Sequence, residues 1–376
     1  MKNIKGKKKI LFIGNSFSDM IKCRGHVMSC LASAGYPVCL FAPFERQHPT
    51  LPQFIHWKHW FCKSKNHNPF IEVLSFLHLF WLLITLRPDI VFSYTAKPNL
   101  YITLFRILFR YKNCCIITGL GRVFTIRVPF YQFMKKLLTL SFKLASQVWV
   151  MNQFDYRYFK FTKVNSYLSY MPGEGVDIER FAPKEPLDSK DNSPVKLLFI
   201  GRLLKSKGLE ELFEAVKNLS LKGNKILLTV IGPYDVHDPD KINKEQFDSL
   251  VNQELIKYGG VVEDVRELIQ QSDCLILPSY REGLPRVLLE ASSMECPVIT
   301  TKVPGCQDVV IEGFNGFLVP ARCSKSLEDA IGKFMSLPEK KRQELGREGR
   351  KLIQNRFTTV HVQSIYLEAL KTLTKG

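Results

Sequence analysis

The sequence lacks the features that would mark a secreted or membrane-spanning chain. Its ten cysteines form no Cys-x-x-Cys pair, and a disulfide framework is typical of much shorter secreted chains. The longest apolar stretch, Val73 to Leu86, has 14 residues, whereas a spanning helix needs about 20. The apolar run Ile10–Ile13 behind the basic N-terminus is too short for a signal peptide. We therefore expect a cytosolic chain with reduced cysteines and no transmembrane segment.

A regular set of metal ligands is also missing. His56, His59, Cys62 and His67 lie close together in the sequence. Their spacing matches no standard zinc site, and the stretch around them is rich in aromatic residues. We expect no bound metal.

Acidic residues are scarce in the first half of the chain. Residues 1–180 contain 25 Lys and Arg against 8 Asp and Glu, a net charge of +17, whereas residues 181–376 contain 28 and 27, a net charge of +1. This asymmetry predicts an anionic partner for the first half only. The candidates are an anionic membrane face, an acceptor that carries a pyrophosphate, and nucleic acid. The stretch Val73–Leu86 is either a helix packed on a sheet or a helix that also enters a bilayer surface.

The fold class follows from the order of the apolar segments. Hydrophobic residues make up 45% of the 376 residues, enough for a large core in two domains. Continuous apolar strands alternate with helices from Lys9–Gly14 to Tyr167–Met171, and the alternation restarts at Val195–Gly201. Strands of this kind are typical of parallel sheets that helices cover on both faces. We therefore predict an α/β protein with two Rossmann-like, doubly wound parallel-sheet domains and further helices at the C-terminus.

The predicted boundaries follow from composition. The first domain takes residues 1–181, and a polar segment with three prolines, 182–194, is the linker. The second domain takes residues 195–355, and a last helix in 356–376 packs back on the first domain. Two such domains facing each other imply a cleft, since parallel sheets bind ligands at the carboxyl ends of their strands.

Three groups of residues in the second domain are candidates for chemistry. Arg202 and Lys207 lie in a strand-to-helix turn, where two cations beside a helix N-terminus can bind a diphosphate. Glu282 and Glu290 flank a Gly turn and the start of a helix, and carboxylates accept hydrogen bonds from ribose and sugar hydroxyls. Two Gly-bearing loops, in 303–320, could close around a ligand. Taken singly, each group is also compatible with solvated surface residues or ordinary turns.

The order of these segments adds to their meaning. The second domain contains, in sequence, Gly201–Gly208, Asp273–Ala291, Pro297–Ile299 and Gly313–Pro320. This series closely resembles the family-4 retaining glycosyltransferases of GT-B fold over residues 195–320. The first half contains Tyr94–Asn99, Ile117–Gly121 and Gly173–Asp177. These segments are similar to a narrower branch, the bacterial enzymes that add a HexNAc, often GalNAc, to an undecaprenyl-diphosphate-linked sugar.

The resemblance implies roles for four residues that act on the donor. Arg202 and Lys207 would neutralise the donor diphosphate, which is the leaving group. Glu282 would contact the donor sugar, and Glu290 would bind the ribose hydroxyls. Of these, Glu282, Arg202 and Lys207 are the predicted catalytic residues, because two cations can stabilise a leaving diphosphate without a metal.

The resemblance also implies contacts outside the catalytic group. Backbone N–H groups at Gly283 and Leu284 would contact the phosphates, and Gly232 would line the donor site. Gly14 and Asn15, in the first strand-to-helix loop of the chain, would lie across the cleft from them.

The acceptor side is less defined. Lys97, Arg122 and Arg127 are candidates for binding an acceptor diphosphate, or they are ordinary surface cations. Many family members carry a His after the fourth strand of the first domain, where this chain has Thr118–Gly121. The catalytic base is therefore unassigned. A front-face mechanism, in which the leaving phosphate takes the acceptor's proton, needs none.

The sequence therefore predicts a retaining, metal-independent glycosyltransferase of the hexosyltransferase type. Its donor is a UDP-sugar, such as UDP-GalNAc, and its acceptor is a polyprenyl-diphosphate-linked sugar in lipopolysaccharide, capsule or glycan synthesis. We expect a peripheral protein on the cytoplasmic face of the inner membrane. The alternatives are another UDP- or GDP-hexose donor or another acceptor, a nucleotide-sugar epimerase, and a nucleic-acid-binding protein. The last has only the charge in its favour, because the sequence contains no nucleic-acid module, and we expect no nucleic-acid partner.

Overall fold

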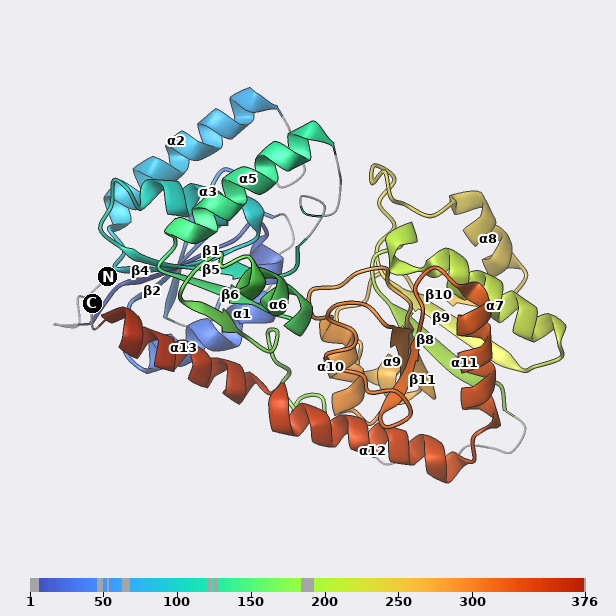
Figure 1. Ribbon diagram of the computed structural model, residues 1–376. Coiled ribbons are helices and arrows are strands. Elements are labelled where there is room, and N and C mark those ends of the chain that lie inside the picture. The colour runs from blue at the N-terminus through green and yellow to red at the C-terminus, as the bar shows by residue number, and fades with distance from the viewer. Residues whose placement is uncertain are drawn as a thin grey trace. The chain divides into compact units, whose positions relative to one another are not determined.

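The computed structural model describes residues 7–45, 50–52, 54–62, 68–120, 124, 128–183 and 193–374. Its contacts divide the chain into two compact units (Figure 1). The first unit combines Met1–Gly175 with Thr359–Gly376, and the second unit is Val176–Thr358. The first unit is therefore built from two separate stretches of sequence, and the second from one.

The first unit contains a seven-stranded parallel sheet in the order β3-β2-β1-β4-β5-β6-β7. Its strands are β1 (Ile10–Ile13), β2 (Val38–Ala42), β3 (Ile55–His59), β4 (Ile90–Tyr94), β5 (Lys112–Ile117), β6 (Gln147–Val150) and β7 (Leu168–Tyr170). In β1, Ile10 pairs with Val38 on one side and with Ile90 on the other, and all four residues of the strand are buried. The chain order reverses at β1, so the loops after β1 and β4 lie at the switch point of the sheet.

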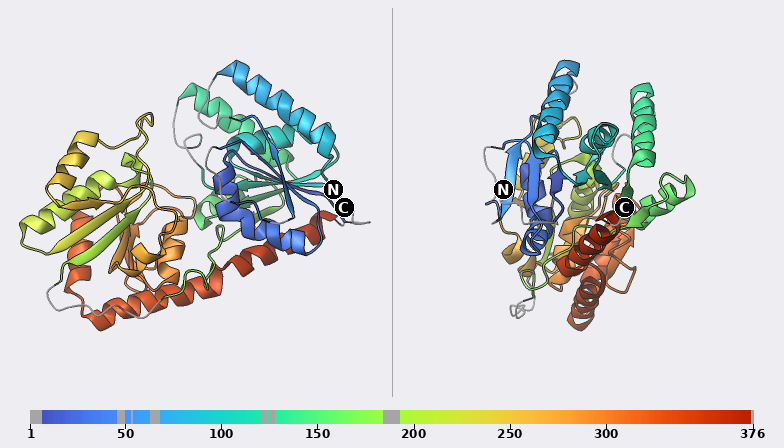
Figure 2. Two further views of the ribbon diagram at one scale, coloured as in Figure 1. Left: turned by 180° about the vertical axis from the view of Figure 1, so that it is seen from behind. Right: turned by 90° about the vertical axis from the view of Figure 1, so that its left-hand side faces the viewer.

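Helices cover both faces of this sheet. They are α1 (Phe17–Ser33), α2 (Pro69–Leu86), α3 (Ala96–Phe105), α5 (Pro129–Leu144), α6 (Gln153–Phe161) and α13 (Thr359–Thr374). The views agree that α2, α3 and α5 lie on one face, and that α1 and α13 lie on the other (Figures 1 and 2). Side-chain caps set three of the helix starts, since Ser16 accepts from the Asp19 amide, Asn68 from the Phe70 amide and Asn152 from the Asp155 amide.

The late helix α13 completes the core of the first unit. Its Tyr366 is fully buried, and its ring lies 6.1 Å from Phe12, 5.0 Å from Phe92 and 4.9 Å from Trp149 between ring centroids. The Tyr366 and Tyr94 hydroxyls share a hydrogen bond of 2.5 Å. A buried tyrosine needs such a partner for its hydroxyl, so the sheet and α13 are joined by both packing and hydrogen bonding.

The second unit contains a six-stranded parallel sheet in the order β10-β9-β8-β11-β12-β13. Its strands are β8 (Val195–Ile200), β9 (Ile226–Ile231), β10 (Ile256–Tyr258), β11 (Cys274–Leu277), β12 (Val298–Thr301) and β13 (Gly316–Val319). Its helices are η1 (Lys205–Lys207), α7 (Leu209–Leu221), α8 (Lys244–Asn252), α9 (Arg266–Gln270), α10 (Arg286–Ser293), α11 (Ser324–Ser336) and α12 (Glu339–Arg356). The central strands β8, β11 and β12 are mostly buried and apolar, as sheets with helices on both faces require.

Both sheets confirm the predicted fold class. Several elements of the described chain were not predicted, namely the edge strands β3, β10 and β13, the helices α6 and α8 and the short helix η1. Their sequences are short or polar, and β3 and β10 contain two lysines and two histidines among their eight residues, so these segments lack the continuous apolar pattern of a central strand. The contacts end the first unit at Gly175, whereas the sequence suggested residue 181. Residues 184–192 of the predicted linker lie outside the described residues.

Candidate functional site

The predicted donor residues of the second unit follow parallel strands at one edge of the sheet. Gly201 comes directly after β8, Gly232 after β9, and Pro278 after β11. The carboxyl ends of parallel strands meet at the same edge, which is where open α/β sheets bind ligands. The loops that follow these strands therefore define the candidate site.

The loop after β8 is held against the loop after β11. Gly208 has φ +72°, and a Cβ there would lie 2.0 Å from the Pro278 carbonyl oxygen. The Tyr280 backbone N–H also donates to the Ser206 carbonyl at 2.9 Å. Only a glycine allows both the positive φ and this close approach. The consequence is that Lys207 and Glu282, 75 residues apart in sequence, lie next to each other.

Lys207 and Glu282 form an ion pair, with 2.5 Å between Nζ and Oε1. Their side chains are 21% and 13% exposed, so the pair is partly shielded from water. Shielding strengthens a charge-assisted contact relative to one on an open surface. Two of the three predicted catalytic residues are thus brought together. In the absence of a ligand, each neutralises the other.

The third predicted catalytic residue, Arg202, reaches a different partner. Its guanidinium lies 3.8 Å from the carboxylate of Asp238, which is 6% exposed while Arg202 is 59% exposed. Asp240 braces the same loop, because its carbonyl accepts from the Lys205 amide at 2.7 Å and its carboxylate accepts from the Ser206 amide at 3.3 Å. Arg202 therefore contacts Asp238 through its guanidinium and remains largely open to solvent.

The sequence reasoning missed these two aspartates. Asp238-Pro239-Asp240 has the Asp-x-Asp spacing that can bind a metal, and that spacing, soon after β9, was the available signal. In the structure both carboxylates face the loop that carries Arg202 and Lys205–Lys207 instead. We find no group of three or more potential metal ligands in the part of the chain that the structure describes.

Two further glycines make the site compact. Gly232 has φ +143°, and a Cβ there would lie 1.9 Å from the Gly201 carbonyl oxygen. Gly305 has φ +83°, and its Cβ would lie 2.4 Å from the Gly283 carbonyl oxygen. The loop after β12 therefore packs on the backbone beside Glu282. In the other predicted loop, Asn315 is buried in a turn, where its side chain accepts from the Ile311 amide at 2.7 Å.

Glu290 projects from the helix that follows the Glu282 loop. It lies 2.8 Å from the Arg286 guanidinium, one turn earlier on α10, and is 12% exposed. Burial raises the pKa of Glu290, and the positive charges of Arg286 and Arg180 oppose this shift. Within the described residues, no side chain caps α10, whose N-cap is Pro285. The N-terminus of α10, which begins two residues after Leu284, carries the positive end of the helix dipole and so favours an anion nearby.

A buried thiol lies near the ion pair. Burial raises the pKa of Cys306 to about 12, with Glu282 adding to the shift and Lys207 opposing it. Cys306 is therefore a neutral thiol at physiological pH, and a neutral thiol is a poor nucleophile. Its place is structural, beneath the loop that carries Gly305.

The predicted residues of the first unit lie at the switch point of the other sheet. Gly14 and Asn15 follow β1 directly, before the Ser16 cap of α1. Lys97, in the first turn of α3, forms an ion pair with Glu72 of α2 at 2.7 Å. Glu72 also accepts from the Tyr101 hydroxyl at 2.6 Å, so this lysine helps to join α2 to α3. Arg122 and Arg127 lie outside the described residues.

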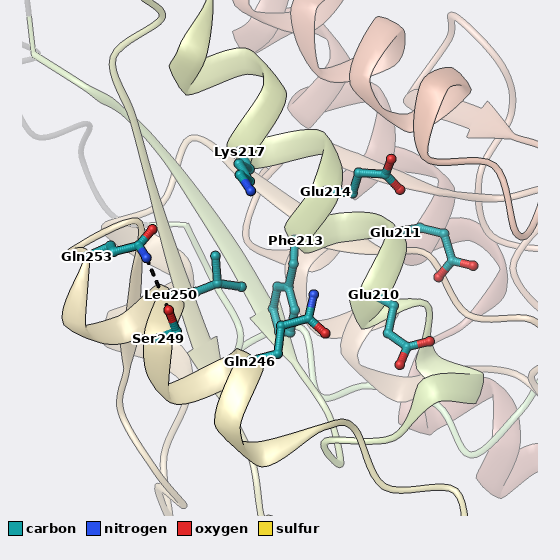
Figure 3. Close-up of a pocket in the computed structure, with 9 residues that line it drawn as sticks. All are labelled: Glu210, Glu211, Phe213, Glu214, Lys217, Gln246, Ser249, Leu250 and Gln253. Carbon is teal, nitrogen blue, oxygen red and sulfur yellow. Dashed lines mark hydrogen bonds between the residues drawn. The ribbon is translucent and has the colours of Figure 1, made fainter.

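A separate hollow of about 480 Å³ lies on the second unit between α7 and α8 (Figure 3). Three glutamates of α7 line one side of it, namely Glu210, Glu211 and Glu214. Among the described residues, none of the predicted site residues lines this hollow. Its carboxylates would repel a diphosphate, so it does not fit the predicted donor.

The fold and the cationic loops define a class, the glycosyltransferases of GT-B fold. Residues 180–352 match the family model described as "Glycosyl transferases group 1". The second unit therefore carries the domain of group 1 glycosyltransferases, which is GT family 4.

Curated relatives agree with this family. The capsular polysaccharide biosynthesis glycosyltransferase CapM of Staphylococcus aureus is 30% identical over 217 residues, covering 54% of this chain and 55% of that protein. The N,N'-diacetylbacillosaminyl-diphospho-undecaprenol alpha-1,3-N-acetylgalactosaminyltransferase of Campylobacter jejuni is 26% identical over 283 residues, covering 70% and 72%. The chain thus matches only about half of the Staphylococcus protein.

Solved structures resemble the whole chain in fold. Sucrose-phosphate synthase of Thermosynechococcus elongatus matches with a TM-score of 0.84 at 18% identity, covering 98% of this chain and all of that one. HepE of Anabaena, in complex with UDP-glucose, matches with a TM-score of 0.77 at 16% identity, covering 97% and 100%. Together these comparisons confirm the predicted fold, and they show a group 1 glycosyltransferase domain in residues 180–352. The donor, the acceptor and the residue roles stay predictions.

Proposed function

We propose that this protein is a retaining glycosyltransferase that transfers a sugar from a UDP donor, with UDP-GalNAc as the leading candidate, to a polyprenyl-diphosphate-linked sugar. The observation that carries the proposal is the Lys207–Glu282 pair at the carboxyl edge of a group 1 domain. Two relatives act, by name, on diphosphoundecaprenol-linked sugars, those of Campylobacter jejuni and Escherichia coli. The product would enter cell-surface polysaccharide.

The ion pair gives the donor a place to bind. A diphosphate carries more negative charge than Glu282 and competes with it for Lys207. Glu282 is then free to accept hydrogen bonds from sugar hydroxyls. Arg202, held by Asp238 and exposed, adds a second cation, and the amide groups at the start of α10 add donors.

The same residues account for the chemistry. The bond between the anomeric carbon and the β-phosphate oxygen breaks, and the acceptor hydroxyl oxygen bonds to that carbon from the same face. The acceptor's proton passes to the leaving phosphate oxygen. Lys207 and Arg202 stabilise the charge that develops on the diphosphate, so the step needs neither a side-chain base nor a metal ion.

The acceptor and the location follow from the first unit. Its net positive charge suits a diphosphate on a lipid carrier and an anionic membrane. We therefore assign this unit to the acceptor, with Lys97, Arg122 and Arg127 as the candidate contacts. The protein would act as a peripheral protein on the cytoplasmic face of the inner membrane.

A transfer screen tests the proposal. It pairs UDP-GalNAc, UDP-GlcNAc, UDP-Gal, UDP-Glc and GDP-Man with short, water-soluble polyprenyl-diphosphate-sugar acceptors. We expect transfer from one UDP-sugar, loss of transfer in Glu282→Gln, and no loss in Glu214→Gln, which alters an exposed glutamate on α7.

Other outcomes would overturn parts of the proposal. Transfer from GDP-Man alone would refute the UDP donor. Conversion of UDP-GlcNAc to another nucleotide sugar without acceptor would identify an epimerase. Equal activity of Glu282→Gln and Glu214→Gln would remove Glu282 from the site.

A further inference from the structure

The helix α2 presents apolar side chains both to the core and to solvent. Its inner residues Leu79, Leu82, Leu83 and Leu86 are buried among the side chains of the first unit. Its outer face exposes Phe70, Val73, Leu74, Leu77, Trp81 and Ile84. These positions repeat at helical spacing and form a continuous stripe. A helix on the surface of a soluble domain normally turns polar residues to water, so this stripe calls for a covering partner.

The stripe continues onto the neighbouring helices. On α5 the exposed apolar residues are Phe130, Phe133, Leu140 and Leu144, and beyond the end of α3 they are Ile107 and Leu108. Phe76 of α2 stacks on Phe105 of α3 at 4.3 Å between centroids, and Arg106 donates to the Leu144 carbonyl of α5. All three helices lie on one face of the sheet (Figures 1 and 2). We call their outer surface the α2–α5 face.

The charged residues on this face are almost all positive. The helices α2, α3 and α5 together contain a single carboxylate, Glu72, and it is paired with Lys97. Lys136 and Lys143 are exposed on α5, in the same stripe as Phe133 and Leu140. Exposed apolar side chains with lysines among them, and few carboxylates nearby, are typical of helices that bind an anionic bilayer surface.

The geometry of α2 favours docking over spanning. It is the one helix among the described residues that could cross a membrane by length and composition, with a mean hydropathy of 1.9 over 18 residues, 28% of them buried. However, its inner leucines are part of the first unit's core. A spanning position would expose that core, whereas a helix lying in the interface keeps it and buries only the outer stripe, about 5–10 Å deep.

We propose that the α2–α5 face is a membrane-docking surface whose partner is an anionic lipid bilayer, with the outer stripe of α2 inserted into the interfacial layer. The proposal rests on the proposed function only for the location of the acceptor, which a lipid carrier would hold at that layer. Two forces act together, since lysines attract the anionic surface and apolar side chains leave water. Salt should therefore weaken docking without removing the inserted contact.

Trp81 offers a direct probe, because it is 58% exposed in the middle of the stripe while Trp60 and Trp149 are buried. The full-length protein is mixed with vesicles of phosphatidylcholine and phosphatidylglycerol, with and without brominated acyl chains. We expect bromine to quench the fluorescence of the bound protein, and Trp81→Phe to bind but to lose most of the quenching. Bound protein whose Trp81 is quenched only by aqueous acrylamide would overturn the insertion.

Charge-introducing variants test the face itself by vesicle co-sedimentation. We expect Leu77→Glu on α2 and Phe133→Glu on α5 each to weaken binding by about tenfold or more. The control is Leu221→Glu, which alters a still more exposed leucine at the end of α7 in the second unit and should bind as the parent does. Because all three positions are exposed, thermal unfolding should be unchanged.

The remaining outcomes separate this proposal from others. Absence of vesicle binding, together with a dimer that Leu77→Glu dissociates, would identify a second copy of the chain as the partner. Normal transfer by Leu77→Glu to a short soluble acceptor, with transfer lost only on vesicle-bound acceptor, would support docking. Vesicle binding by a protein that transfers no sugar would refute the proposed function and leave the docking surface in place.

Discussion

The two units follow one plan inside and different plans outside. Both bury a parallel sheet of apolar strands between helices. On the second unit the helix surfaces carry ion pairs within one or two turns, such as Lys205–Glu210, Lys325–Asp329 and Lys341–Glu344. On the first unit, α2 and α5 carry exposed apolar residues and almost no carboxylates. Packing on the sheet constrains only the inner faces of the helices. The residues on their outer faces can therefore differ between the units according to what each unit binds.

Each unit contains a partly buried Lys–Glu ion pair, and the two pairs have nearly the same distance. Lys97 pairs with Glu72 at 2.7 Å in the first unit, and Lys207 pairs with Glu282 at 2.5 Å in the second, with both lysines 21% exposed. The first pair joins two helices, and the second lies in loops at the carboxyl edge of a sheet. The two pairs are nearly the same in distance and burial, so the different roles proposed for them rest on their positions in the fold.

Replacing each of these two lysines by alanine should give the largest difference in enzyme activity. We expect Lys207→Ala to lower kcat/KM by about 10²- to 10³-fold, the typical cost of losing one group that stabilises developing charge. Lys97→Ala should leave UDP release without acceptor unchanged and, at most, raise the KM for the acceptor. Steady-state assays of UDP release and of transfer measure both. Equal loss of UDP release in the two variants would contradict the assignment of donor chemistry to the second unit.

The first strand-to-helix loops of the two units should differ in how well they tolerate replacement of a glycine by alanine. Gly208→Ala forces a Cβ against a backbone carbonyl at positive φ, whereas at Gly14 a Cβ meets only the flexible Met20 side chain. We expect a loss of about 2–4 kcal/mol of unfolding free energy for Gly208→Ala and about 1 kcal/mol for Gly14→Ala.

Urea unfolding can report the two units separately. All four tryptophans lie in residues 57–149, in the first unit. Gly208→Ala should therefore shift the transition seen by circular dichroism more than the one seen by fluorescence. An unchanged circular-dichroism midpoint for Gly208→Ala would show that a Cβ beside the Pro278 carbonyl does not lower the unfolding free energy.

The smallest expected effect concerns Glu290, a carboxylate of the proposed donor site. Burial raises the pKa of Glu290, so the folded state binds its proton more tightly than the unfolded state does. Ionised Glu290 therefore lowers stability as pH rises through that raised pKa. Glu290→Gln should be slightly more stable than the parent near pH 7, and the difference should vanish below about pH 4, where Glu is protonated in both states. Thermal melts across pH measure it, and a destabilised variant at pH 7 would contradict it.

The sequence was sufficient for the fold and for part of the site, for physical reasons. Continuous apolar strands such as Ile10–Ile13 predict a buried parallel sheet, which the structure confirms. The turn with Arg202 and Lys207 predicts an anion site, which stays a prediction. The Lys207–Glu282 contact was not predictable from spacing, because the close approach of Gly208 to Pro278 creates it. The pairing of Arg202 with Asp238 and of Lys97 with Glu72 likewise depends on which loops and helices pack together.

The exposure of α2 shows another limit of sequence reasoning. The run Val73–Leu86 has apolar residues on all sides, and composition alone left a packed helix and a membrane-surface helix open. The structure shows a packed inner face, with Leu79 and Leu83 buried, and an outer face that exposes the apolar side chains of Leu77 and Trp81. Membrane contact of that outer face stays a proposal. A uniformly apolar helix has no polar stripe from which its orientation could be read.

The position of Tyr366 has a consequence for the order in which the protein is made. Phe12, Phe92 and Trp149 leave the ribosome well before the helix that covers them, because the whole second unit is translated in between. The second unit can fold during synthesis as a continuous segment, while the first unit waits for residues 359–374. A nascent chain stalled before Thr359 should thus hold a finished second unit beside an open first unit, the form most exposed to proteases and chaperones.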